Sequence, residues 1–93
     1  IIDVRDFPEA KNPAYKLLID FGETIGVKKS SAQITALYKK ADLINKQVIA
    51  VVNFPEKQIA NFMSECLVLG AVCKNEVTLI HPNLVTENGL RIS

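Results

Sequence analysis

The chain has 93 residues, of which 48% are hydrophobic and 23% are charged, a composition typical of one globular domain and not of a disordered segment. No apolar run approaches the roughly 20 residues needed to span a bilayer, so we expect no membrane insertion. No basic and then apolar signal segment opens the chain, but it begins at Ile1, and a leader upstream of that residue is left open.

Positive charge is concentrated in the middle of the chain, although the formal net charge is only +1. The segment from Lys28 to Lys57 holds six lysines and two carboxylates, whereas the remainder carries five cations and eight anions. A basic segment in an otherwise acidic chain suits a polyanionic partner. A solvated lysine face that only maintains solubility is the alternative, and charge by itself does not separate the two.

The first part of the chain is expected to form three strands. Ile1 to Phe7 is the first, and the turn-forming residues Glu9 to Pro13 follow it. Tyr15 to Phe21 alternates apolar and polar residues, which predicts a half-buried strand. Lys28 to Thr35 is the third, with Ser30, Ala32 and Ile34 on one face and Lys29, Ser31, Gln33 and Thr35 on the other. The second of these faces has no apolar side chain, so we expect it to meet water or a ligand.

A short helix is expected next. Leu37, Ala41 and Ile44 recur at helical spacing, and the helix should end near Asn45. Asparagine suits the left-handed conformation that commonly follows a helix end.

The second half of the chain returns to strands. Gln47 to Val52 is a continuous apolar run with β-branched residues, which predicts a central strand. Cys66 to Leu69 and Glu76 to Ile80 are the remaining strand candidates, with a turn over Ala71 to Asn75 between them. Asn88-Gly89 marks a tight turn near the C-terminal end.

The stretch from Asn53 to Gly70 begins where the strand Gln47 to Val52 ends, and it finishes with the strand Cys66 to Leu69 and Gly70. The part between these two strands is expected to be a loop. Loops on a rigid β scaffold commonly carry function. This one combines amides, hydroxyls and a cation with large apolar side chains: Asn53, Phe54, Lys57, Gln58, Asn61, Phe62, Met63, Ser64 and Glu65. The aromatic residues either belong to a binding surface or close one end of the core, because large aromatics dominate core burial.

The order of elements predicts a mainly β fold over residues 1–93. Five strands with a short helix between strands 3 and 4 match the oligonucleotide/oligosaccharide-binding (OB) fold, a five-stranded barrel. A generic small α+β domain is the competing architecture.

Several sequence blocks resemble the CsaA family of small tRNA-binding OB proteins, which are related to tRNA-binding domains of some methionyl- and phenylalanyl-tRNA synthetases. The similarity is most specific in K-K-S-S-A-Q-I-T at Lys28 to Thr35 and in Gln47 to Gly70. Phe7 to Leu17, Ile19 to Gly22 and Pro82 to Gly89 also match the family pattern. This chain lacks the family's opening pattern and has Glu56 where proline is common and Cys66 where a β-branched residue is usual.

The resemblance implies an OB barrel, a homodimer, affinity for tRNA and a proposed role as a secretion chaperone. By position, it transfers the family's polar surface to Lys29, Ser30, Ser31, Gln33, Asn53, Lys57, Gln58, Asn61 and Ser64. Lysines such as Lys28, Lys29 and Lys57 would neutralise phosphates, and Phe54 or Phe62 could stack a splayed base. Alternatively, Phe54, Phe62 and Met63 would line an apolar groove for unfolded preproteins.

No catalytic, metal or cofactor motif is present in the sequence. Ser30 and Ser31 lack a Gly-x-Ser-x-Gly context, and no glycine-rich phosphate loop occurs. Cys66 and His81 are the only thiol and imidazole that could pair, and neither cysteine spacing nor composition fits a zinc site. We therefore expect a cytoplasmic binding protein that is not an enzyme, with Cys66 and Cys73 both reduced.

Overall fold

Alternating apolar and polar residues in the first third of the chain produce a three-stranded antiparallel sheet. In the computed structural model, which describes residues 1–93, it contains β1 (Asp3–Asp6), β2 (Tyr15–Asp20) and β3 (Val27–Ala32) in that order. Leu17 of β2 lies opposite Val4 of β1 and Ser30 of β3, and all three are buried. The sheet therefore has one face in the core, as the period-two pattern predicts.

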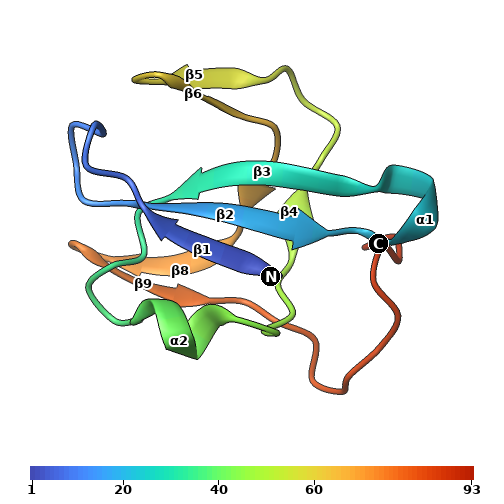
Figure 1. Cartoon of the computed structure of the whole chain (residues 1–93). Helices are drawn as coiled ribbons and strands as arrows, with labels where there is room; N and C mark the ends of the chain where they lie inside the picture. The colour runs from blue at the N-terminus through green and yellow to red at the C-terminus, as the bar shows by residue number, and fades with distance from the viewer.

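Six shorter strands form three further two-stranded sheets, all antiparallel. The fold is mainly β, with 37% of residues in strands and 9% in helices. The pairs are β4 (Ala50–Val51) with β7 (Leu67–Val68), β5 (Lys57–Ile59) with β6 (Phe62–Ser64), and β8 (Gly70–Cys73) with β9 (Glu76–Leu79). Hairpins β5–β6 and β8–β9 lie on opposite sides of the β1–β3 sheet in Figure 1, and both extend toward the end where the β1–β2 loop lies.

Two helices of one turn each connect the strands. α1 (Gly22–Ile25) joins β2 to β3, and α2 (Lys40–Leu43) lies between β3 and β4, where a short helix was predicted. Asn45 follows α2 with φ 66°, which confirms its left-handed conformation. Neither helix has the length or apolar character to cross a membrane.

The strand count and the barrel closure differ from the prediction. Nine strands replace five, and their hydrogen-bonded ladders do not close into a barrel. The smaller sheets are joined by single backbone bonds: Leu69 N donates to Ile49 O (2.8 Å), Ile49 N to Ile80 O (3.2 Å) and Ile80 N to Leu69 O (3.2 Å). Because each of these residues bonds to two different segments, β4 and β7 stay paired over only two residues.

Three predictions about individual segments are wrong. The expected strand Gln47 to Val52 is paired only at Ala50–Val51, because Ile49 already bonds elsewhere. The expected loop between Val52 and Cys66 contains hairpin β5–β6, and the expected turn from Ala71 to Asn75 is mostly strand β8, with the turn at its end. Short hairpins are hard to recognise in a sequence because two or three residues are too few to show a period.

The core brings together residues from both halves of the chain. Tyr15, Leu17, Ile19 and Phe21 are all buried, which confirms the alternation in β2. They pack in one cluster with Ile1, Val4, Ile34, Leu43, Cys66 and Leu79. The hydroxyl of Tyr15 donates to Tyr38 O (2.8 Å), and the Tyr38 hydroxyl accepts from Leu79 N (3.0 Å), so β2 and β9 are linked through Tyr38.

Candidate functional site

A groove of about 1010 Å³ lies at the end of the fold to which both hairpins extend. We call it the basic groove. Its walls are the β1–β2 loop (residues 10–14), the end of β3 with the following turn (31–36), the β5–β6 hairpin, residues 66–70, and the β8–β9 hairpin. Segments from both halves of the chain therefore meet around one depression.

The lining of the basic groove is positively charged. Lys11, Lys57 and Lys74 line it, and no Asp or Glu does. The two ion pairs of the chain, Arg5–Asp3 and Lys40–Asp6, lie elsewhere, so none of these three ammonium groups has a carboxylate partner. Unpaired lysines around a concave surface attract anions, since the field is concentrated in the depression. Amides and hydroxyls of Asn12, Ser31, Gln33, Thr35, Ser64 and Asn75 share the same lining.

The structure brings five of the predicted site residues together in the groove: Ser31, Gln33, Phe54, Lys57 and Ser64. Lys29 lies two residues before Ser31, on the same outward face of β3. Asn53 instead lines a different cavity. Lys28 lies on the other face of β3, which it shares with Ser30.

Ser30 and Ser64 do not fit their predicted contact with a ligand. Both side chains are buried, and both hydroxyls donate to Cys66 O, at 2.8 and 3.2 Å. Ser64 Oγ also accepts from Ser31 N at 3.1 Å. These hydroxyls form hydrogen bonds at the edge of β3 where no strand is paired with it, which is a structural role. The sequence motif alone does not show whether a serine has this role or contacts a ligand.

The β5–β6 hairpin carries the other predicted residues. Lys57, Gln58, Asn61 and Met63 are all exposed on it, and Gln58 Nε2 donates to Ala60 O (3.1 Å) in the turn. Phe62 is half-buried and is not a free stacking surface, because its ring lies 5.5 Å from that of Phe7, measured between centroids.

Among the lysine and asparagine residues of the groove, sequence reasoning missed Lys11, Asn12, Lys74 and Asn75. The first two lie in a segment recognised only as turn-forming, and the other two in the β8–β9 turn. Each pair combines a cation with an amide, and this combination could have identified them in the sequence as candidate ligand contacts. Their convergence with β3 depends on the fold.

The structure provides no catalytic pair from Cys66 and His81. Cys66 is buried, its thiol lies 3.9 Å from Lys29 O, and burial raises the pKa of that thiol. A raised pKa lowers the thiolate fraction, which is the opposite of what a nucleophile needs. His81 is exposed, with Nδ1 2.9 Å from Pro82 O. No three His, Cys, Asp or Glu side chains gather into a metal site.

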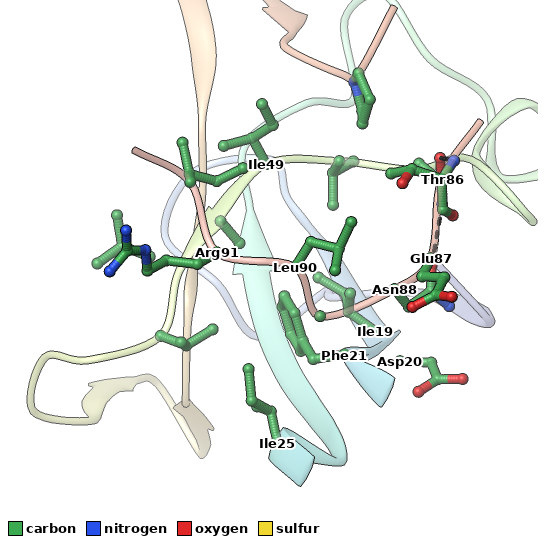
Figure 2. Close-up of a pocket in the computed structure, with 18 of the residues that line it drawn as sticks. Ile19, Asp20, Phe21, Ile25, Ile49, Thr86, Glu87, Asn88, Leu90 and Arg91 are labelled. Carbon is green, nitrogen blue, oxygen red and sulfur yellow. Dashed lines mark hydrogen bonds between the residues drawn. The ribbon is translucent and has the colours of Figure 1, made fainter. Parts of the chain in front are cut away.

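A second cavity, of about 430 Å³, lies under the C-terminal segment. In Figure 2, Leu90 lies beside Ile19 and Phe21. Gln47 holds this segment: its Nε2 donates to Thr86 O (2.6 Å), and its Oε1 accepts from Thr86 N (3.2 Å). Gly89 turns the chain with φ 88°, and any Cβ at this position would lie 2.0 Å from Phe21 O. The lining of this cavity is largely aliphatic and includes Asp20 and Glu87, so it does not share the charge of the basic groove.

Residues 1–91 match the protein family described as "Putative tRNA binding domain". Among individual proteins, the chain is 30% identical over 92 residues to the methionine–tRNA ligase of Thermococcus onnurineus, and 32% identical over 92 residues to that of Nanoarchaeum equitans. In both cases the match covers 99% of this chain but only 12% of the ligase. The chain thus corresponds to about an eighth of those enzymes.

Two solved structures are similar over nearly the whole chain. The CsaA chaperone protein from Picrophilus torridus is 60% identical with a TM-score of 0.94, and the match covers 100% of this chain and 85% of that one. Chaperone CsaA from Bacillus anthracis strain Ames is 52% identical with a TM-score of 0.94, covering 99% of this chain and 84% of that one.

Proposed function

The chain belongs to the CsaA family of tRNA-binding-domain proteins, and from this premise we propose that it binds tRNA through the basic groove and the adjoining outward face of β3, without catalysing a reaction. The observation that carries the proposal is the lining of the groove, which has three lysines without carboxylate partners and no acidic residue. Residues 1–93 form the proposed binding domain. The methionine–tRNA ligases in the comparison are enzymes, but they are about eight times as long as this chain.

The chemistry of each side chain indicates which part of the RNA it would contact. Lys29, Lys57, Lys11 and Lys74 would neutralise phosphates and release counterions, which gives affinity with little sequence information. Ser31, Gln33, Gln58 and Asn61 would hydrogen-bond sugar hydroxyls or exposed base edges, and Phe54 would contact an unstacked base within the groove. Ser30 and Ser64 act from the core by holding β3 to the strand segment that follows the hairpin.

The test is a filter-binding assay that measures the affinity of the protein for total tRNA at a series of salt concentrations. If lysines bind the phosphates, the logarithm of the affinity falls linearly with the logarithm of the salt concentration, by a little under one unit per phosphate contact. An affinity that does not change with salt would contradict the proposal, because hydrophobic contacts are not screened.

A second function has its own observation in its favour. Leu67 and Val72, which are 51% and 72% exposed, line the basic groove, and the solved relatives are named chaperones. Exposed apolar side chains of this kind could hold an unfolded preprotein segment. In that case a denatured preprotein would bind with little salt dependence, and changing Leu67 and Val72 to serine would weaken capture of the preprotein more than binding of tRNA.

We also propose that the protein is a homodimer through its terminal segments. Leu84, Val85 and Ile92 are 75%, 94% and 63% exposed, and Ile2 is half exposed, so apolar side chains at both ends of the chain face outward. A twofold interface would bury them. Sedimentation at micromolar protein is expected to show a dimer, and a single monomeric species would refute this assembly.

The cytoplasm is the proposed compartment, where tRNA is available. Both cysteines are free thiols in the structure, Cys66 buried and Cys73 exposed, as suits a reducing environment.

A further inference from the structure

Four side chains form a compact cluster on the outward side of the sheet, where the β5–β6 hairpin meets β2 and β3. We call it the Phe62 cluster, and its members are Phe7, Lys16, Lys29 and Phe62. The ammonium of Lys16 lies 4.8 Å from the Phe7 ring centroid and 5.5 Å from that of Phe62, and the ammonium of Lys29 lies 5.3 Å from the Phe62 centroid. All three distances are within the range of a cation–π interaction.

The main chain of Lys29 is also held, by two hydrogen bonds to Glu65. Its amide donates to Glu65 Oε1 at 2.9 Å, and its carbonyl accepts from Glu65 N at 2.8 Å. Oxygen Oε1 of Glu65, the residue after β6, therefore accepts a hydrogen bond from the backbone of Lys29. Lys29 is held at both ends, since its backbone is bonded to Glu65 and its ammonium lies against Phe62.

Lys16 occupies a matching place on the neighbouring strand. It lies opposite Ser31 of β3 and Arg5 of β1, on the outward face of the sheet. Neither Lys16 nor Lys29 forms an ion pair with a carboxylate. Two unpaired ammonium groups thus converge on one aromatic ring beside the basic groove.

The Phe62 ring is already surrounded. Phe7, which is buried, meets it at a centroid distance of 5.5 Å with the ring planes tilted by 59°, and two ammonium groups approach it as well. A base stacking on this ring would have to displace at least one of these neighbours. A ring in such surroundings is better suited to hold cations than to receive a base.

We propose that Phe62 is a positioning residue, which holds the ammonium groups of Lys16 and Lys29 ready for the phosphates of RNA and does not itself stack a base. This inference rests on the proposed tRNA binding. Ordering a lysine side chain costs entropy, and an ammonium already held at the ring has lost part of that freedom before RNA arrives. Each exposed cation–π contact corresponds to about a two- to fivefold change in affinity.

The experiment compares two polyanions, tRNA and inorganic polyphosphate, of which only the first has bases. Affinities are measured for the wild type, Phe62→Leu, Phe62→Tyr, Lys16→Ala/Lys29→Ala, and that double variant with Phe62→Leu added. Lys46→Ala is the matched control, because the Lys46 ammonium also lies over a ring, that of Tyr38 at 5.9 Å, and belongs to neither the basic groove nor the Phe62 cluster. Circular dichroism verifies folding, and Phe62→Met replaces Phe62→Leu if the leucine variant is unfolded.

If Phe62 positions the lysines, Phe62→Leu weakens binding of tRNA and of polyphosphate by the same factor, about two- to fivefold per ammonium. Phe62→Tyr retains the ring and restores binding, and Phe62→Leu causes no further loss once both lysines are alanine. The inference is overturned if polyphosphate binding is unchanged while tRNA binding falls, because that result indicates stacking. An undiminished loss in the lysine-free background overturns it as well. Failure of the proposed function is a separate result, since wild-type tRNA binding would then be independent of salt.

Discussion

Changing Lys29 and Lys57 together to alanine is expected to weaken tRNA binding on the order of tenfold at physiological salt. The plot of log affinity against log salt should flatten by about one unit for each phosphate contact that is lost. Neither lysine has a carboxylate partner, so no ion pair of the folded chain is lost in the variant. The loss should be similar for all tRNA species, because phosphate contacts carry no sequence information.

The control for this prediction removes the same charge from the same basic segment. Lys39 and Lys46 also lie between residues 28 and 57, but neither lines the basic groove or belongs to β3. Their double alanine variant should keep most of the affinity and most of the salt dependence. If both double variants behave alike, tRNA responds only to net charge, and the basic groove is not the binding surface.

Leu17→Ala is expected to lower the free energy of unfolding by about 2–5 kcal/mol, the usual range for truncating a buried leucine. Leu17 is only 1% exposed, and its side chain lies in the core between Tyr15 and Ile19 on the inward face of β2. Small domains typically have about 5–15 kcal/mol of stability in total. The variant should therefore unfold at much lower urea concentration.

The neighbouring residue provides the matched comparison. Leu18 is on the same strand, and its truncation removes the same atoms, but it is 38% exposed on the outward face. Leu18→Ala should cost less than about 1 kcal/mol, as is usual for partly exposed positions. Equal losses in urea unfolding for the two variants would mean that β2 does not separate a core face from an outward face.

Much of the local structure can be read from the sequence. The alternation from Tyr15 to Phe21 is strong because one face of β2 must be apolar to reach the core, and the four apolar residues of that face are buried as predicted. The left-handed Asn45 and the tight turn at Gly89 are equally local, because each depends on the φ values that a residue tolerates. The short hairpins were missed because their strands are too brief to show a period.

The composition of the candidate site could be predicted in part. The basic middle segment was visible as charge, and Lys57, Ser31 and Gln33 do line the groove. Ser30 and Ser64 belong to the same family pattern, but both are buried. Their hydroxyls form hydrogen bonds to the backbone in place of missing bonds between strands, a role that suits serine as well as ligand contact does. Residue type by itself cannot separate these roles.

By itself, the sequence determined the three strands of the first sheet, which face of β2 is apolar and where positive charge is concentrated, because these properties depend on neighbouring residues. Only the tertiary structure decided that Lys11 and Lys74 lie in the same groove as Lys57, and that Lys16 and Lys29 converge on Phe62. The physical reason is that these contacts join residues 13 or more positions apart, and they form only after the pairing of β2 with β3 and the docking of the hairpins have set their register.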